Sequence, residues 1–400
     1  MPSYPLLKDA DLKGKRVLLR VGFDVPIENG KIEDSSRIES LVPTMRFILD
    51  HGASLILLSH QGRPKGKPLP EFSQKPLVPV LEKLLGVSVK FAPSPTGKET
   101  ESMATALKTG EMLLVENLRF DPGEEKNDPA FAKALAILGE VYVNDAFTNC
   151  HRAHASMVGL PALLPHFTGL QLQEEVTHLS RIVEDPKRPI TLIISGVKME
   201  TKVPVIERFL SLGDDILLGG AIANTFIAAR GFNIGQSKYE EEQLEKAQEL
   251  MLESEKEHRA TIHVPRDAVV ASDASEEAMK LDLPLEDITG DMSIFDVGKV
   301  TIERYLSIIA QSRTIVWNGP LGLSELNRFS HGTKRIAEAV AAATKGGAVS
   351  IIGGGDTIDF HTRYGFDLSS YTFVSMGGGA MLEFVSGEKL PALEALQVNR

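Results

Sequence analysis

The sequence predicts an α/β protein whose parallel β-sheets carry helices on both faces. Three observations support this class. The chain has 400 residues, which suits two domains at about 100–200 residues each. Short runs of Val, Ile and Leu recur along it, and they are continuous rather than alternating, which is typical of strands buried on both faces of a parallel sheet. Helix-like stretches separate these runs, so strand, loop and helix alternate repeatedly.

The expected strands are apolar runs of similar length, the last weaker than the others. In chain order they are 17–19, 55–58, 112–115, 141–143, 191–194, 216–218, 315–317, 349–352 and 372–375. Helix-like stretches include 76–85, 129–138, 240–256, 301–311 and 332–344. A further helix is expected at 170–183, and the polar turn 184–189 follows it. This segment is the best candidate for a connector between two successive α/β halves.

Composition excludes several classes of protein. With 42% hydrophobic and 24% charged residues, the chain resembles an average globular protein. Its 43 Lys and Arg against 54 Asp and Glu give a net charge of −11, too acidic for a general nucleic-acid or anionic-membrane binder. Any anionic ligand therefore needs a local basic pocket.

Cysteine usage and hydropathy indicate the compartment. The single cysteine, Cys150, has no intramolecular disulfide partner. No run approaches the roughly 20 apolar residues of a membrane span, and the first residues lack the apolar stretch of a signal peptide. We therefore expect a soluble cytoplasmic protein.

Basic residues follow the expected strands of the first half. In an open parallel sheet, ligands bind beyond the carboxyl ends of the strands, so these loops matter most. They contain Arg20, Arg63, Arg119 and Arg152, and Arg37 adds another guanidinium. Any single arginine could be a solvated surface residue, but their recurrence at one structural position indicates a pocket for a small polyanion. The histidines at 60, 151 and 154 lack the spacing of a metal site.

Glycines follow the expected strands of the second half. They occur at 196, 219–220, 319, 353–355 and 377–379. Glycine lets backbone amides approach an anion closely, and a helix that starts there adds its positive end. Lys198 and Lys202 are expected on one face of a helix that begins at Gly196, where both could reach phosphates. Asp356, beside three glycines, is placed to hold Mg²⁺.

Absent motifs narrow the reaction. The sequence has neither the P-loop spacing GxxxxGK[ST] nor GxGxxG after a strand, and it lacks the GxSxG elbow and HExxH. A polyanion pocket in one half and a nucleotide-phosphate site in the other indicate phosphoryl transfer between ligands of the two halves.

Eight motifs, in order along nearly the whole chain, resemble those of the phosphoglycerate kinase family. They are RVGFDVP, SHQGRPKG, ENLRF, NDAF with HRAHAS, GVKMETK, VWNGPLG, GGGDT and SMGGGAMLE. The resemblance implies two Rossmann-like lobes joined by a central helix and hinge. It implies an acceptor lobe at 1–168, on which 385–400 returns to pack, a connecting helix at 169–185 and a nucleotide lobe at 186–384. The implied reaction moves a phosphoryl group between ATP and the carboxylate of 3-phosphoglycerate, giving ADP and 1,3-bisphosphoglycerate, in a cytoplasmic monomer that uses Mg²⁺ and binds neither nucleic acid nor membrane.

The resemblance also implies residue roles. The positions implied to bind phosphoglycerate are Gly22, Asp24, His60, Arg63, Arg119 and Arg152. Those implied to bind the nucleotide are Lys202, Gly219, Gly220, Ala221, Asn318, Glu325, Gly353, Gly355, Asp356 and Thr357, with Asp356 also the metal ligand. The implied catalytic positions are Arg37, Lys198, Gly354, Gly377 and Gly378. No general base is needed, because the attacking carboxylate is already ionised at neutral pH.

The first motif departs from the family pattern, which has Asp where this chain has Gly22 and Asn where it has Asp24. Thr148 and Asn149 also replace the usual Gly-Thr. Asp24 or Asn149 could serve the hydroxyl that the missing Asp contacts. An active kinase is the first hypothesis, and a weakly active or non-catalytic relative or a kinase for a different small carboxylate are the alternatives. Under the first, Gly22→Asp with Asp24→Asn should tighten phosphoglycerate binding.

Overall fold

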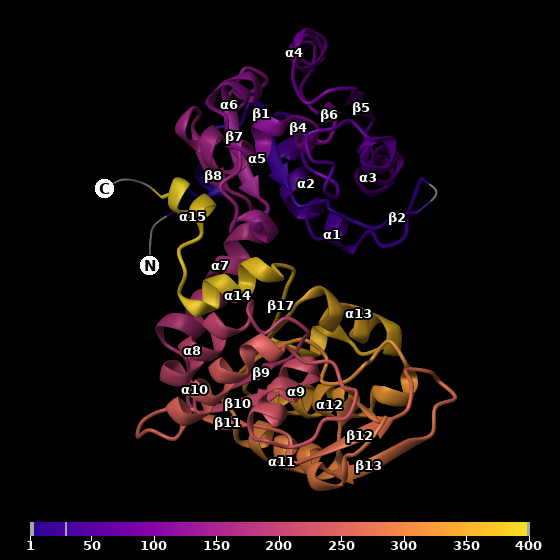
Figure 1. Cartoon of the computed structure of the whole chain (residues 1–400). Helices are drawn as coiled ribbons and strands as arrows, with labels where there is room; N and C mark the ends of the chain where they lie inside the picture. Colours follow the sequence, from indigo (N-terminus) through magenta and orange to yellow (C-terminus); the bar gives the residue numbers. More distant parts are fainter. Residues whose placement is uncertain (1–3, 29, 398–400) are drawn as a thin grey trace. The chain divides into compact units, whose positions relative to one another are not determined.

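The computed structural model describes residues 4–28 and 30–397 and divides into two compact units (Figure 1). The first unit runs to Thr177 and takes in the residues from Lys389 onward; the second is His178–Glu388. Each unit has its own six-stranded sheet in which all neighbouring strands are parallel. The predicted α/β class is therefore confirmed.

The sheet of the first unit has the strand order β5-β6-β4-β1-β7-β8. Its strands are β1 (Arg16–Val21), β4 (Ser54–Leu58), β5 (Val89–Ala92), β6 (Met112–Val115), β7 (Val141–Asp145) and β8 (His166–Thr168). All residues of β4, β6 and β7 are buried, which explains why their sequences are continuously apolar. The outer strands β5 and β8 were not predicted. They are part-exposed edge strands without a long apolar run.

Helices cover this sheet on both sides. The helices of the unit are α1 (Ser36–Glu39), α2 (Val42–Asp50), α3 (Val78–Leu85), α4 (Lys98–Thr105), α5 (Pro122–Glu125), α6 (Pro129–Ala136) and α15 (Pro391–Ala395). A short hairpin joins β2 (Ile27–Glu28) to β3 (Lys31–Ile32). Although α15 comes from the end of the chain, it packs in this unit, where Ala392 N donates to Cys150 O at 3.1 Å (Figure 1).

The sheet of the second unit has the order β11-β10-β9-β15-β16-β17. Its strands are β9 (Ile190–Ile194), β10 (Asp215–Leu218), β11 (Thr261–His263), β15 (Thr314–Asn318), β16 (Val349–Gly353) and β17 (Phe373–Ser375). A second, antiparallel sheet of β13 (Lys280–Pro284), β12 (Asp267–Ala271) and β14 (Ser293–Val297) was not predicted. Residues of β13 are mostly exposed, so this strand carries no apolar run.

The helices of the second unit are α8 (Val203–Leu212), α9 (Gly220–Ala229), α10 (Leu244–Ser254), α11 (Lys299–Gln311), α12 (His331–Lys345), α13 (Gly355–Tyr364) and α14 (Gly379–Ser386). The expected helix at 170–183 is α7 (Leu170–Glu184), which begins in the first unit and ends in the second. Within the described ranges, no helix is long and apolar enough to span a membrane.

In each sheet, the first strand of the unit lies in the interior, and later strands are added on both of its sides. Thus β1 pairs with β4 on one side and with β7 on the other, and β9 pairs with β10 and β15 in the same way. Loops that leave such neighbouring strands at their carboxyl ends diverge and leave space for a ligand. The candidate residues of each half therefore belong to one such edge.

Candidate functional site

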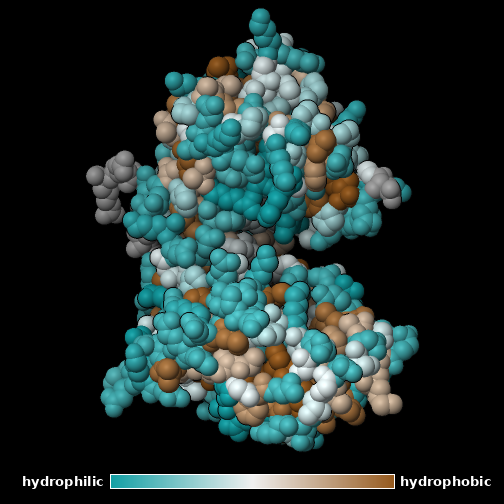
Figure 2. Space-filling view, in the orientation of Figure 1, coloured by the Kyte–Doolittle hydropathy of each residue, from teal (hydrophilic) through white to brown (hydrophobic). Residues whose placement is uncertain are grey.

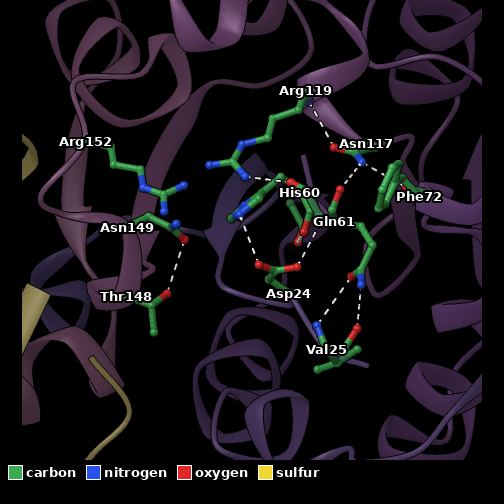
Figure 3. A network of polar contacts seen from close by, with 12 residues as sticks. Asp24, Val25, His60, Gln61, Phe72, Asn117, Arg119, Thr148, Asn149 and Arg152 are labelled. Carbon is green, nitrogen blue, oxygen red and sulfur yellow. Dashed lines mark hydrogen bonds and ion pairs between the residues drawn. The ribbon is translucent and has the colours of Figure 1, made fainter. Parts of the chain in front are cut away.

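The first candidate site is a basic pocket at the carboxyl ends of β1, β4, β6 and β7. We define it by Asp24, His60, Arg119, Asn149 and Arg152. Figure 3 shows the guanidinium groups of Arg119 and Arg152 directed toward the same space as His60 and Asp24. Residues from distant parts of the first unit therefore converge, as their loop positions predicted.

Backbone contacts hold the carboxylate and one guanidinium beside this pocket. Gly62 N donates to Asp24 Oδ1 at 2.9 Å, and Asp24 Oδ2 lies 3.8 Å from His60 Nε2. Arg37, on α1, donates from Nη1 to Asp24 O at 2.6 Å. The carboxylate and the guanidinium are thus fixed next to each other without forming a direct ion pair through these atoms.

A buried arginine sets the tautomer of His60. Arg20 is fully buried and its Nη2 lies 3.0 Å from His60 Nδ1. Because a guanidinium can only donate, His60 Nδ1 accepts, and the ring proton is on Nε2, the nitrogen nearer Asp24. Burial and the charge of Arg20 hold the pKa of His60 well below its usual range. His60 is therefore a neutral hydrogen-bond donor at physiological pH.

Arg20 itself is part of a buried network beneath the pocket. Its Nε donates to Ser156 Oγ at 2.9 Å, and that hydroxyl donates to Glu124 Oε1 at 2.6 Å. Burial lowers the pKa of Arg20, and the charge of Glu124 opposes this effect. Loop position had suggested Arg20 as a member of the polyanion pocket, whereas the structure buries it as support for His60. Glu124 and Ser156 were not identified from the sequence, although Ser156 ends the HRAHAS motif.

Contacts with neighbouring residues fix the side chains of two of the predicted arginines. Arg119 donates from Nη1 to Gly62 O at 2.7 Å, and its Nε lies 3.4 Å from Glu125 Oε1. Arg152 donates from Nε to His151 Nε2 at 3.1 Å. Arg63 is exposed in the loop after β4, and no described contact fixes its side chain in the pocket.

The Thr148 side chain lies in the space beside Gly22. Gly22 is buried at the end of β1, and a Cβ there would lie 2.5 Å from Thr148 Oγ1. An Asp at this position cannot be accommodated unless Thr148 moves. The expected gain from Gly22→Asp with Asp24→Asn stays a prediction, and it requires the Thr148 side chain to move out of this space.

The second candidate site is a cavity of about 310 Å³ in the second unit. Among the predicted residues, Gly220, Ala221, Glu325 and Asp356 line it. Apolar side chains such as Leu321 and Ile294 contribute its remaining walls. In Figure 2, apolar atoms gather on the second unit over the region where Figure 1 labels α9. An apolar cavity with a few polar groups at its rim suits a flat organic ring with a charged tail.

Hydrogen bonds join the loops after β15 and β16 beside this cavity. Lys202 Nζ donates to Asn318 Oδ1 at 3.0 Å, and Asn318 Nδ2 donates to Gly353 O at 2.9 Å. Gly319 N donates to Thr357 Oγ1 at 2.8 Å, and this hydroxyl donates to Gly353 O at 2.9 Å. Thr357 therefore ties the two loops together. Its role at the nucleotide phosphates, which the family resemblance implies, stays a prediction.

Glycine at position 354 is required by the backbone. Gly354 precedes α13 with φ of +99°, and a Cβ there would lie 2.7 Å from Asn318 Nδ2. Gly355 begins α13 and Gly353 ends β16. Gly219 N is used in a hydrogen bond to Ile194 O at 3.1 Å, immediately before α9.

The expectation that Lys198 and Lys202 share one helix face is wrong. Residues 196–202 form a loop, and α8 begins only at Val203, with Pro204 in its first turn. Met199 is fully buried, and Lys202 N and Val203 N both donate to its carbonyl, so the chain turns here. Lys198 is exposed, whereas burial lowers the pKa of Lys202 to about 8, opposed by the charge of Asp356.

The last glycine loop follows β17. Gly377 is buried, and its N–H donates to Ser375 Oγ at 3.1 Å, so that amide already has a partner within the loop. Gly378 precedes α14 with φ of +52°. Neither glycine lines the cavity, but Ser375 pairs with Gly353 across β17 and β16, so the two glycine loops leave adjacent strands.

Comparisons with known proteins agree on one family. The family model for phosphoglycerate kinase matches residues 7–388. The phosphoglycerate kinase of Chloroflexus aurantiacus is 43% identical over 394 residues, which are 98% of each chain, and that of Methylorubrum extorquens is 44% identical over the full length of both. The solved structure of phosphoglycerate kinase from Coxiella burnetii has a TM-score of 0.87 at 37% identity and covers 98% of this chain and 99% of its own. The chain belongs to the phosphoglycerate kinase family.

Proposed function

We propose that this protein transfers a phosphoryl group between ATP and the carboxylate of 3-phosphoglycerate, giving ADP and 1,3-bisphosphoglycerate. The observation that carries the proposal is the pairing of two different anion sites, each at the carboxyl edge of a six-stranded parallel sheet. One is lined by guanidinium groups, and the other is an apolar cavity beside loops of glycine and lysine. This arrangement fits a small phosphorylated acid and a nucleotide.

In the first unit, Arg119 and Arg152 would hold the phosphate of the acceptor. The long side chain of Arg63, in the loop after β4, would also reach this phosphate. A guanidinium matches a phosphate bidentately, and the neutral His60 adds an N–H that keeps its donor role over a wide pH range. Arg37, held at the pocket by Asp24 O, would reach the reacting carboxylate. The carboxylate needs no base, because it is ionised before it attacks.

In the second unit, Gly219, Gly220 and Ala221 would lie under the adenine, and Glu325 would bind the ribose. Lys202 and Asn318 would contact the phosphates, and Lys198 would follow the transferring group. Asp356 is exposed and lines the cavity near Lys202, and one carboxylate with phosphate oxygens and waters is the ligand set Mg²⁺ favours. When bound there, Mg²⁺ would neutralise charge on the phosphate oxygens.

Catalysis would consist of positioning and of charge stabilisation on the phosphoryl oxygens. Arg37 and Lys198 would supply cations, and the glycine loops at Gly354, Gly377 and Gly378 would turn backbone amides toward the phosphoryl oxygens. Because the two sites are in different units, turnover requires the units to bring the substrates into line. We also infer a cytoplasmic monomer, since both substrates are intracellular metabolites and Cys150, the single cysteine, is buried.

A coupled assay with ATP, Mg²⁺ and 3-phosphoglycerate tests the proposal. We expect steady turnover that Arg152→Ala reduces through KM for the acceptor. A second candidate, a kinase for a different small carboxylate, is suggested by Gly22 and Asp24. A panel of phosphorylated and unphosphorylated carboxylates separates it, because a preferred acceptor other than 3-phosphoglycerate would reject the first proposal.

A further inference from the structure

The first unit contains another cavity, which neither candidate site uses. Its volume of about 580 Å³ is in the usual range for small-molecule sites. Its walls come from the segment after β4, the first turn of α3 and the loops after β5 and β6. The cavity therefore lies at the carboxyl edge of the sheet, where parallel sheets bind their ligands.

Proline rings and one aromatic ring form most of this wall. The residues are Pro68, Pro70, Pro76, Pro79, Pro93 and Phe120. Proline has no backbone N–H and its ring is rigid, so this surface is apolar, offers no backbone donors of its own and loses little entropy when a ligand packs on it. The wall therefore fits an apolar side chain, and an aromatic ring can also pack on Phe120.

Glu116 is the acceptor group of the cavity. Its Oε1 accepts from Gln74 N at 2.8 Å and from Asn117 N at 2.7 Å, and its Oε2 accepts from Ser73 Oγ at 2.7 Å. A carboxylate accepts about four hydrogen bonds, so Oε2 keeps one position for a ligand donor. Glu116 is only 7% exposed, and these three partners are neutral. A buried negative charge with neutral partners favours a cationic donor.

Lys75 supplies the opposite charge at the rim. It is exposed and also lines the cavity, and its backbone N donates to Ser73 Oγ at 3.2 Å. Among the residues that the structure describes, Lys75 and Glu116 form no ion pair with each other. One cavity thus offers a carboxylate and an ammonium group that are both available to a ligand, together with an apolar wall.

We propose that this cavity binds a free α-amino acid with an apolar side chain. The ammonium group of the amino acid donates to Glu116 Oε2, its carboxylate lies near the Lys75 ammonium, and its side chain packs on the prolines and Phe120. A ligand with only one of these charges leaves Glu116 or Lys75 without a partner. The site goes beyond the proposed function and does not depend on it.

The test compares three compounds by calorimetry on the parent protein. They are L-phenylalanine, 3-phenylpropanoate, which lacks the ammonium group, and phenethylamine, which lacks the carboxylate. L-phenylalanine should bind about tenfold or more tightly than 3-phenylpropanoate, because the latter cannot donate to the buried Glu116. It should bind about two- to fivefold more tightly than phenethylamine, since Lys75 is exposed to water. Equal affinities, or no binding of L-phenylalanine, would overturn the proposal.

Two variants assign the charges. Glu116→Gln keeps an oxygen for the two backbone amides but removes the charge, so the preference over 3-phenylpropanoate should fall to about threefold or less. Lys75→Ala should remove the preference over phenethylamine alone. Lys83→Ala is the matched control, because Lys83 is exposed on α3 and does not line the cavity. Full retention of the parent's preferences in both site variants would overturn the proposal, and Lys75→Ala decides it without changing the buried Glu116.

A further variant tests the place of binding. The carboxylate of L-phenylalanine could instead bind in the basic pocket, so Arg152→Ala is measured with the same compound. Its affinity should equal that of the parent, because Arg152 does not line this cavity. Loss of binding in Arg152→Ala with full binding in Glu116→Gln would place the amino acid in the basic pocket and overturn the proposal. Calorimetry needs no turnover, so failure of the proposed phosphoryl transfer would leave this test intact.

Discussion

In both units the candidate ligand site lies at the carboxyl edge of a parallel sheet, but different kinds of chemical group support it. The edge of β1, β4 and β7 is supported by buried charged side chains, with Arg20 linked through Ser156 to Glu124. The edge of β9, β15 and β16 is supported by hydroxyl, amide and backbone groups, such as Thr357 between Gly319 N and Gly353 O. Sheet topology thus fixes where a ligand binds and leaves its chemistry to the loops.

This difference has energetic consequences. A buried charge that loses its partner is costly because it cannot be resolvated, whereas a lost neutral hydrogen bond costs about 1 kcal/mol. The first unit should therefore respond strongly to substitutions beneath its site, and the second should respond mainly in ligand binding and catalysis.

The largest expected effect is on stability at Arg20. Arg20→Met leaves the Glu124 carboxylate buried without its opposing charge and should destabilise the first unit by about 3–5 kcal/mol. Thr191→Val in the second unit, which removes a buried hydroxyl pair with Ser312, should cost only about 1 kcal/mol. Urea unfolding followed by circular dichroism measures the total, and the fluorescence of Trp317, the single tryptophan, reports the second unit alone.

A paired substitution sharpens this prediction. Arg20→Met combined with Glu124→Gln removes both charges, so the double variant should be more stable than Arg20→Met alone. Losses that simply add would show that the two charges do not stabilise each other, and the contrast between the two units would fail.

The next effect is on catalysis, in the second unit. If Lys198 follows the transferring group, Lys198→Ala should lower kcat by about 10²–10³ with little change in stability, because the residue is exposed. Lys345→Ala, an exposed lysine in the last turn of α12, is the control and should leave kcat unchanged. A kcat close to that of the parent would remove Lys198 from the mechanism.

Removing a guanidinium from the basic pocket should weaken binding of the acceptor and leave binding of the nucleotide unchanged. Arg152→Ala should raise KM for 3-phosphoglycerate by about tenfold or more, the usual effect of a lost charge-assisted contact of about 1.5–3 kcal/mol, and should leave ATP affinity unchanged. Calorimetry with each substrate measures the two affinities separately. Weaker nucleotide binding with intact acceptor binding would mean that the two sites are assigned the wrong way round.

The smallest expected effect is a pH dependence of ATP affinity that acceptor affinity does not share. The pKa of Lys202 is about 8 because the residue is buried, so its charge is present below pH 8 and is lost as pH rises through that value. ATP affinity should fall about tenfold from pH 7 to pH 9, and Lys202→Met should remove this dependence. Acceptor affinity should stay flat, since the pKa of His60 is far below this range. A parallel fall in both affinities would contradict the assignment of Lys202 to the nucleotide.

The sequence by itself determined the fold class, the central strands and the chemical character of each sheet edge. This was possible because a strand buried on both faces must be apolar throughout, and because ligand loops follow such strands directly. The runs at 112–115 and 191–194 therefore predicted β6 and the greater part of β9. Elements without this pattern, such as the exposed β13, gave no comparable signal.

Only the tertiary structure decided which side chains support the sites and which contact one another. Arg20 looked like a surface ligand from its loop position, yet it is buried under His60. The loop at Lys198 does not continue α8, because the buried Met199 turns the chain before Val203. Gly22 and Thr148 are far apart in the sequence, and neither residue type predicts that one fills the space left by the other. Atoms exclude one another from the same space only where they are close in the folded protein. Residues far apart in the sequence can be such neighbours, and a local sequence pattern does not show which ones meet.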